Sequence, residues 1–444
     1  MPSAIQIIGG GLAGCEAAWQ AARAGVRSVL YEMRPVRATA AHRTDALAEL
    51  VCSNSLKSET EFTAPWLLKQ ELRRLGSLLL GVAAEARIPG GQALTVDREV
   101  FAAAVSRAMA DCPAIEVRRE EATSIPAEGI VIIATGPLTS DALAGDIARL
   151  TGSERLYFYD AISPVIEADS IDQGVTFRAS RYGKSMDGTE DYLNCPMDRA
   201  QYELFVGALL EAQAHAPHIA DDTAYFEACL PVEELARRGP DTLRFGPMKP
   251  MGLIDPRTGR RPWAAVQLRQ ENLRASSYNM VGFQNYLRYG DQARVFRMIP
   301  GLERAEFLRY GQVHRNTYIN APALLETTLA MRATPRVFFA GQISGVEGYV
   351  ESIATGLLAG RNAAALARGE PGWRPPRHTA LGSLCAYICG ADPARYQPAN
   401  ITFDLLPPLE PELGQRLRHD RRGRHAEICR RALECLDEAL AAHA

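Results

Sequence analysis

The chain has 444 residues, of which 47% are hydrophobic and 23% are charged, and its formal net charge is -3. This composition is typical of a globular protein with two or three domains, and it excludes a largely disordered chain. The net negative charge also excludes a uniformly basic surface, so contact with a polyanion has to depend on local clusters of positive residues.

Hydropathy and cysteine usage narrow the class further. No basic segment followed by a long apolar core opens the chain, and no later stretch reaches the ~18 apolar residues of a membrane span. The nine cysteines are unevenly spaced and form no Cys-x-x-Cys pair, which suits a reducing compartment. We therefore expect a cytoplasmic protein that does not bind to the membrane and has no metal site.

The first predicted elements form a strand, a glycine turn and a helix. An apolar run over 4–8 enters the turn Gly9-Gly10-Gly11-Leu12-Ala13-Gly14, and an alanine-rich helical stretch follows over 15–24. In such a turn the first glycine permits the bend, the second admits a pyrophosphate, and the third lets helix and strand pack closely. The pattern favours dinucleotide binding over the alternative of a packed turn without a ligand.

The next strand, over 27–31, ends at Glu32, which lies 18 residues after Gly14. A carboxylate at the end of the second strand is the usual partner of a ribose hydroxyl in dinucleotide folds. This spacing supports the dinucleotide interpretation.

Two further apolar strands, over 129–133 and 336–340, are predicted far along the chain, and a helical stretch over 349–367 follows the second. The simplest arrangement is one parallel sheet made from both ends of the chain. We predict an α/β fold: an FAD-binding Rossmann-type domain in two segments, an inserted α+β domain and a helical C-terminal tail. The predicted boundaries are 1–157 for the first FAD-binding segment, 158–330 for the insertion, 331–370 for the return segment and 371–444 for the C-terminal region.

The return segment decides between FAD and a nicotinamide, because a late strand followed by Gly341 and a glycine-broken helix start resembles the flavin side of two-segment FAD enzymes. A helix that begins near Gly348 places partial positive charge where a reduced flavin carries negative charge. Tyr349 either stacks on a flavin or folate ring or is an ordinary half-buried tyrosine.

Two cysteines lie in polar segments that can carry chemistry. Cys52 belongs to the loop 48–58, close to the ribose-binding strand, and Cys229 precedes a predicted helix start with arginines nearby. Spacing alone leaves each of them open as a packing thiol. Segments 278–286 and 314–320 combine amides, aromatic residues and one histidine, which suit a heterocyclic ligand.

The C-terminal stretch is rich in arginine. These residues either contact RNA phosphates or form a solvated helix face. They are Arg416, Arg418, Arg421, Arg422, Arg424, Arg430 and Arg431.

These segments together resemble the TrmFO family of folate- and FAD-dependent tRNA (uracil-5-)-methyltransferases over nearly the whole chain. The segments that carry the resemblance are Gly9 to Gly14, Tyr31-Glu32-Met33-Arg34-Pro35, 48–58, 229–252, 278–284, 314–320 and 341–351. The cofactor-binding set that we predict is Gly9, Gly10, Gly11, Leu12, Ala13, Gly14, Glu32, Met33, Arg34, Gly341, Gln342, Glu347, Gly348 and Tyr349.

The resemblance implies roles for both cysteines. Cys229 corresponds to the nucleophile that adds to carbon 6 of the uracil, and Cys52 to the general base that takes the proton from carbon 5. It also implies FAD, 5,10-methylenetetrahydrofolate as the carbon source, NADPH or NADH as the reductant, and the T-arm of tRNA as the substrate. No obligate protein partner is predicted. The sequence departs from the family pattern at Asn285-Tyr286, where family members carry threonine and then a basic residue.

Two other functions stay open at this point. One is the related FAD enzyme that builds an aminomethyl group on a wobble uridine, for which the predicted tail is short. The other is a flavin- and tRNA-binding protein without catalytic activity.

Overall fold

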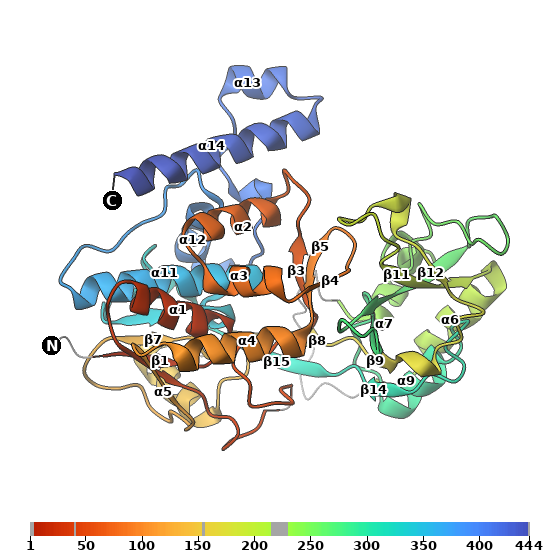
Figure 1. Ribbon diagram of the computed structural model, residues 1–444, viewed down its shortest axis with the longest axis horizontal. Coiled ribbons are helices and arrows are strands. Elements are labelled where there is room, and N and C mark those ends of the chain that lie inside the picture. The colour runs from red at the N-terminus through yellow and green to blue at the C-terminus, as the bar shows by residue number, and fades with distance from the viewer. Residues whose placement is uncertain (1–3, 40, 153–155, 215–229, 443–444) are drawn as a thin grey trace.

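The structure is a computed structural model that describes residues 4–39, 41–152, 156–214 and 230–442. It has two lobes, which lie side by side in Figure 1. We call the lobe built on a parallel sheet the parallel lobe and the other the inserted lobe.

The parallel lobe is built on a five-stranded sheet in the order β16-β7-β1-β2-β6, in which every neighbouring pair is parallel. The strands are β1 (Ile5–Ile8), β2 (Ser28–Tyr31), β6 (Ile115–Arg118), β7 (Val131–Ile133) and β16 (Val337–Phe339). Strand β16 pairs with β7, and β7 pairs with β1, so both ends of the chain contribute to one sheet. The predicted fold class is confirmed, and β6 is a strand that the sequence analysis missed.

Helices cover this sheet. The helices of the parallel lobe are α1 (Leu12–Arg23), α2 (Ala64–Arg74), α3 (Leu78–Glu85), α4 (Arg98–Asp111), α5 (Asp141–Thr151), α10 (Ala321–Leu324), α11 (Tyr349–Ala367) and α12 (Ala380–Gly390). A small antiparallel sheet of β3 (Ser55–Ser58), β5 (Ala93–Val96) and β4 (Arg87–Ile88) lies on the side of the inserted lobe.

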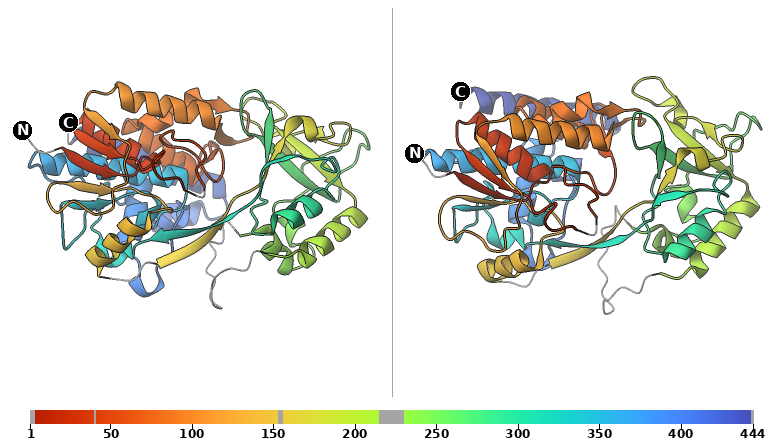
Figure 2. Two further views of the ribbon diagram at one scale, coloured as in Figure 1. Left: turned by 90° about the horizontal axis from the view of Figure 1, so that it is seen from below. Right: turned by 60° about the horizontal axis from the view of Figure 1, so that its bottom comes forward.

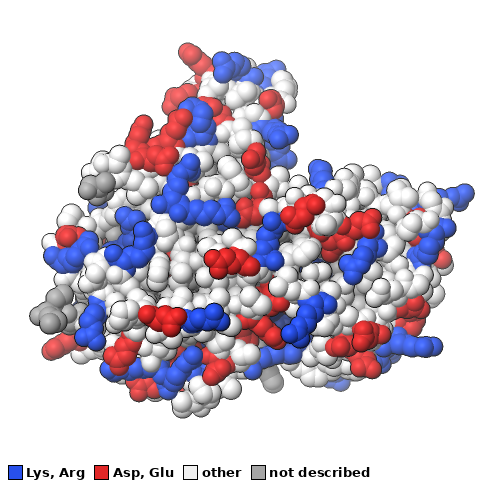
Figure 3. All heavy atoms as spheres, viewed as in Figure 1, with Lys and Arg blue, Asp and Glu red and all other residues white. Residues whose placement is uncertain are grey.

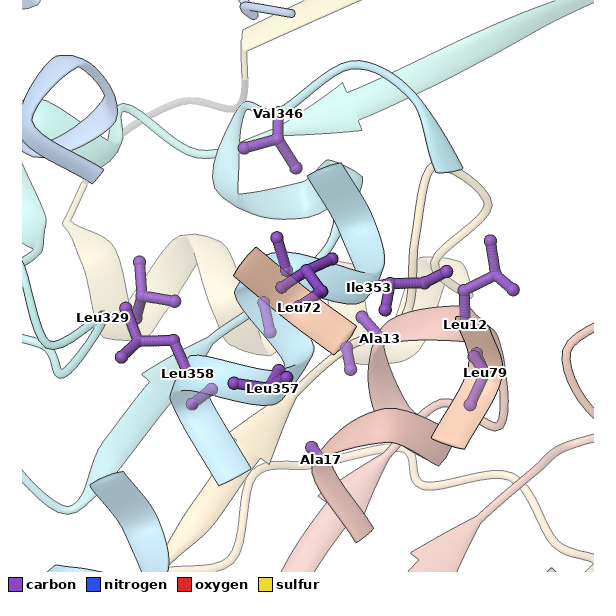
Figure 4. Packing of buried hydrophobic residues seen from close by; sticks show 14 of the residues in the cluster. Leu12, Ala13, Ala17, Leu72, Leu79, Leu329, Val346, Ile353, Leu357 and Leu358 are labelled. Atoms are coloured by element: carbon purple, nitrogen blue, oxygen red, sulfur yellow. The ribbon is translucent and has the colours of Figure 1, made fainter. Parts of the chain in front are cut away.

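Helices α1 and α11 pack closely because glycines replace larger side chains at their contact. A Cβ atom at Gly356 would lie 2.3 Å from the carbonyl oxygen of Ala13, and one at Gly360 would lie 2.4 Å from that of Ala17. Figure 4 shows Ala13 and Ala17 facing Ile353 and Leu357 across this contact. The return segment is thereby fixed against the first segment, with the N-termini of both helices at one edge of the sheet.

The inserted lobe has its own buried core, formed by residues between Ile166 and Ala305. Its antiparallel sheet has the order β10-β11-β12-β13-β9-β14. The strands are β9 (Val165–Glu167), β10 (Phe177–Arg178), β11 (Tyr192–Met197), β12 (Ala264–Gln270), β13 (Ser277–Met280) and β14 (Phe307–Arg309), and the helices are α6 (Arg199–Glu211), α7 (Val232–Arg237), α8 (Thr242–Phe245) and α9 (Tyr289–Phe296).

Two antiparallel strands, β8 (Leu156–Ala161) and β15 (Val313–Tyr318), run between the lobes. Figure 2 shows this pair crossing from one lobe to the other. The chain thus leaves and re-enters the parallel lobe at one place, as a single insertion would. The predicted boundaries at 158 and 330 stay a prediction.

The tail packs on the parallel lobe through α14 (Arg421–Ala441), whose Ile428, Cys429, Ala432 and Leu436 are buried in its core, and α13 (Pro411–Arg416) precedes α14. Arginines and acids are interspersed over these two helices on the face seen in Figure 3. Arg430, for example, pairs with Glu427 and Glu434. Within the described residues, no helix combines the length and the apolarity needed to cross a membrane.

Candidate active site

The turn between β1 and α1 has the geometry that a pyrophosphate needs. Gly9 has φ +110°, and a Cβ atom there would lie 2.5 Å from the carbonyl oxygen of Ala134, so only glycine fits. A Cβ atom at Gly11 would meet nothing within 4 Å, because Gly11 faces open space. Gly11 is also the N-cap of α1 and supplies no side-chain acceptor. The first N–H groups of α1 are therefore available to an anion.

Gly14 and Gly341 hold the elements around this turn together. A Cβ atom at Gly14 would lie 1.9 Å from the carbonyl oxygen of Gly9, and one at Gly341 would lie 2.9 Å from the Cβ of Ala13. The backbone N–H of Gly341 donates to Thr355 Oγ1 at 2.8 Å. The first turn of α1 and the return segment are thus in direct contact.

Glu32 lies at the end of β2, beside the turn. Its carboxylate accepts the Gly10 N–H at 3.2 Å and the Nε of Arg34 at 2.8 Å. Burial acts to raise the pKa of Glu32, but the hydrogen bonds and the charge of Arg34 outweigh it and hold that pKa below its ordinary value. Arg34 also pairs with Glu49 at 2.9 Å. The carboxylate is therefore ionised and fixed at the position predicted for a ribose contact.

A cleft of about 1010 Å³, open solvent at its mouth included, follows the carboxyl ends of β1, β2 and β7. Of the predicted cofactor-binding residues, Gly9, Gly10, Gly11, Leu12, Ala13, Glu32, Met33, Arg34, Gly341, Gln342 and Tyr349 line it. Gly14 does not line the cleft and packs beneath it.

A smaller pocket adjoins the cleft at the N-terminus of α11. Glu347, Gly348 and Cys52 line this pocket, and it shares Val51, Pro137, Leu138, Gln342, Tyr349 and Ser352 with the cleft. The cleft and the smaller pocket therefore share one wall. The smaller pocket thus extends the cleft from the N-terminus of α1 toward Cys52.

Tyr349 joins the return segment to the Cys52 loop. Its hydroxyl oxygen accepts the backbone N–H groups of Cys52 at 2.8 Å and Ser53 at 3.1 Å. Burial raises the pKa of Tyr349 above its ordinary value, and the nearby Cys52 adds to the effect. The hydroxyl therefore stays protonated. The sequence analysis did not predict this anchoring contact, and ring stacking stays a prediction.

The side of the Cys52 loop that faces the inserted lobe is rich in buried polar contacts. The side chain of Asn54 donates to the carbonyl oxygen of Gln270 at 3.0 Å and accepts the Nε of Arg269 at 3.0 Å. Arg98, at the start of α4, pairs with Glu271 at 2.6 Å. We call this region, formed by 50–54, Arg98, 269–271 and Arg309, the junction.

Cys229, the predicted nucleophile, lies outside the described residues. Description resumes at Leu230, and α7 starts shortly after it. Glu233, on the first turn of α7, accepts the backbone N–H of Tyr286 at 2.8 Å. Burial raises its pKa to about 7. This contact links α7 to the segment in which the sequence departs from the family pattern.

Known proteins resemble this chain over its whole length. The family model described as "Glucose inhibited division protein A" matches residues 4–371. A methylenetetrahydrofolate–tRNA-(uracil-5-)-methyltransferase TrmFO from Solibacter usitatus is 68% identical, with 99% of both chains covered. Proteins of the same name from Koribacter versatilis and Geobacter sulfurreducens are 60% and 56% identical over 98% and 99% of this chain.

The chain belongs to the TrmFO family.

A solved structure of GidA from Aquifex aeolicus has the same fold, with a TM-score of 0.69 at 17% identity. It covers 99% of this chain, whereas this chain covers only 75% of that one. That longer protein thus shares the architecture, while the relatives that match end to end carry the TrmFO name. The family resemblance predicted from the sequence is confirmed.

The sequence analysis missed several residues of the site. Glu120, Glu121 and Ala122, which follow the missed strand β6, line the cleft, as does Ser352 on α11. A prediction of β6 would have drawn attention to the first three, because loops after parallel strands lie at the same edge of the sheet. The junction arginines Arg98, Arg269 and Arg309 carried no signal in the sequence. The described residues contain no cluster of side chains suited to a metal ion.

Proposed function

We propose that this chain is a folate- and FAD-dependent tRNA (uracil-5-)-methyltransferase that makes 5-methyluridine in the T-arm of tRNA. The observation that carries the proposal is the wall shared by the dinucleotide cleft and the Cys52 pocket, in a chain that is 68% identical to a TrmFO protein. NADPH or NADH is the proposed reductant.

The residues fit FAD. The open face of Gly11, the uncapped first turn of α1 and the ionised Glu32 supply contacts for the pyrophosphate and a ribose. Gly348 at the N-terminus of α11 supplies partial positive charge beside the Cys52 pocket. When bound, FAD supplies transfer of the one-carbon unit from methylenetetrahydrofolate, together with the reducing equivalent that makes methyl from methylene.

The two cysteines act on the base. The Cys229 thiolate adds to carbon 6 of the uracil, and carbon 5 becomes nucleophilic and takes the one-carbon unit. Cys52 then removes the proton from carbon 5, and the electron pair of that bond expels the carrier of the one-carbon unit and leaves an exocyclic methylene. A hydride, which bound reduced FAD would supply, turns this methylene into methyl, and Cys229 leaves as the double bond between carbons 5 and 6 forms again. Tyr349 contributes by holding the backbone of Cys52 through two hydrogen bonds.

An RNA hairpin with 5-fluorouridine at the target position tests the roles of the cysteines. Fluorine cannot leave carbon 5 as a proton does, so the Cys229 adduct should accumulate on a denaturing gel when FAD, NADPH and methylenetetrahydrofolate are present. Cys229→Ala should abolish the adduct.

The matched control is Cys435→Ala, because Cys435 is a half-buried thiol on α14 in the tail. It should trap as the unsubstituted chain does. An adduct that persists in Cys229→Ala would contradict the nucleophile assignment.

A further inference from the structure

Two arginines from different lobes hold the backbone on the N-terminal side of Cys52. The Nη1 of Arg98, on α4, donates to the carbonyl oxygen of Leu50 at 2.7 Å and to that of Val51 at 3.4 Å. The Nη1 of Arg309, on β14, donates to the carbonyl oxygen of Val51 at 3.1 Å. Together with Tyr349 on the other side, they fix the Cys52 backbone from three separate elements.

The charges of the junction do not balance among the described side chains. Arg98, Arg269 and Arg309 bring three positive charges, and Glu271 brings one negative charge, which pairs with Arg98. Arg269 is only 8% exposed, and its Nε donates to the neutral side chain of Asn54. The guanidinium groups of Arg269 and Arg309 thus have no carboxylate partner within the described residues, which is costly for buried charges unless an anion lies nearby.

Arg309 is the most exceptional of the three. Its Nε and Nη2 are shielded from solvent and have no hydrogen-bond acceptor within the described part of the chain. Burial lowers the pKa of Arg309 to about 10, and the charges of Arg98 and Arg43 act in the same direction. Glu271 and a thiolate at Cys52 oppose this shift. Negative charge at Cys52 is therefore favourable to Arg309, and by reciprocity Arg309 favours that negative charge.

The other charged groups around Cys52 do not reverse this balance. Glu347 lines the same pocket, where Gln342 Nε2 donates to its carboxylate at 2.8 Å, and its one negative charge still leaves the three junction arginines in excess over Glu271 and Glu347. On the segment of Cys52 itself, Lys57 is paired with Glu351 at 2.6 Å, and Glu49 is paired with Arg34. Tyr349 is neutral, and Arg43 adds positive charge from the parallel lobe, where its Nη2 donates to the carbonyl oxygen of Leu308 at 3.3 Å.

We infer that Arg309, supported by Arg98 and Arg269, is a positioning residue that keeps Cys52 as a thiolate, ready to accept a proton. The inference rests on the proposed function only for the origin of that proton, carbon 5 of the uracil. The inserted lobe thereby activates a residue of the parallel lobe, so that Cys52 is a competent base only when the two lobes are docked.

Alkylation of Cys52 by iodoacetamide tests the inference without RNA or folate. The thiolate attacks the reagent and iodide leaves, so the rate follows the thiolate fraction. The full chain with FAD bound is treated between pH 5 and 9, and alkylation at Cys52 is measured by peptide mass spectrometry. Arg309→Gln removes a charge without breaking an ion pair among the described residues of the junction. The midpoint of the rate profile should rise by about half a unit to one unit, and the rate at pH values below the midpoint should fall by about threefold to tenfold.

Three further variants test whether the change in Arg309→Gln is due to the lost charge. Arg309→Lys keeps the charge and should stay near the unsubstituted rate. Arg304→Gln removes an exposed charge from the same lobe and should change nothing. Glu271→Gln removes the negative charge of the junction and should shift the midpoint in the opposite direction, with a faster rate at pH values below the midpoint. This variant also decides the matter if Arg309→Gln fails to fold.

An unchanged midpoint in Arg309→Gln, or an equal shift in Arg309→Lys, would overturn the inference, as would a slower rate in Glu271→Gln. Failure of the proposed function has a different signature. In that case the shifts in alkylation appear as described, but the chain transfers no methyl group to tRNA.

Discussion

The dinucleotide cleft and the junction lie on either side of Cys52, and they are built in opposite ways. The cleft consists mainly of backbone from short contiguous segments, above all the turn from Gly9 to Gly14 and the start of α11. The junction consists of side chains from α4, β12 and β14, which are far apart in sequence. The cleft, which is built from backbone, depends on a few residues in short contiguous segments. The junction, which is built from side chains of distant segments, depends on the docking of the two lobes.

The largest expected effect concerns the docking of the lobes. Arg98→Gln leaves Glu271 as a buried carboxylate without its partner, and the side chains of this pair are only 15% and 9% exposed. Unfolding in urea should show a loss of about 3–5 kcal/mol in stability. Because a neutral amide pair removes the orphaned charge, the double variant Arg98→Gln with Glu271→Gln should recover much of this loss. An equal loss of stability in the single and double variants would show that the ion pair between Arg98 and Glu271 does not contribute to stability.

The next effect concerns the cleft alone. Gly11→Val places a side chain in open space, with nothing within 4 Å of its Cβ, and the residue has an ordinary extended backbone. The fold should therefore survive, with a melting temperature close to that of the unsubstituted chain, while FAD affinity falls by about 100-fold or more because the side chain occupies the pyrophosphate position. Fluorescence titration with FAD measures the affinity. A variant that binds FAD normally would show that the cofactor does not approach this turn.

The smallest effect concerns the inserted lobe alone and appears as a dependence of its stability on pH. Burial raises the pKa of Glu233 in the folded state to about 7, above the ordinary value of 4.5. The folded state therefore holds a proton that the unfolded state has released between about pH 4.5 and 7, and stability falls as pH rises through this window, by up to about 1.4 kcal/mol per unit. In Glu233→Gln, urea unfolding at several pH values should show a weaker decline. A decline identical to that of the unsubstituted chain would exclude Glu233 as its source.

Sequence reasoning reached the parts of the molecule that local patterns determine. The strands that precede Gly9 and Gly341 could be predicted because each is an apolar run that ends at a glycine. Their place in one parallel sheet could be predicted because both glycine turns then lie at the same edge of the sheet. Strand β6, Ile-Glu-Val-Arg, alternates buried and exposed residues at the sheet edge and has too little apolar character to stand out.

The junction could not be predicted from the sequence, for a different reason. Arg98 is one of many arginines in the chain and follows an ordinary helix cap at Asp97, and Arg309 closes a three-residue strand. Nothing in either local segment distinguishes a buried arginine from a solvated one. Only the contact between β14 and the Cys52 loop, which are more than 250 positions apart, gives them a role.

The central claim is that one carbon moves from a folate to a tRNA uridine beside Cys52. The most direct test incubates unmodified tRNA with the chain, FAD, NADPH and methylenetetrahydrofolate labelled at the methylene carbon, and then measures the nucleosides by mass spectrometry. We predict labelled 5-methyluridine from the T-arm, with a rate that falls by about 10² to 10⁴ in Cys52→Ala while FAD stays bound. Unlabelled or absent 5-methyluridine, or full activity in Cys52→Ala, would contradict the account.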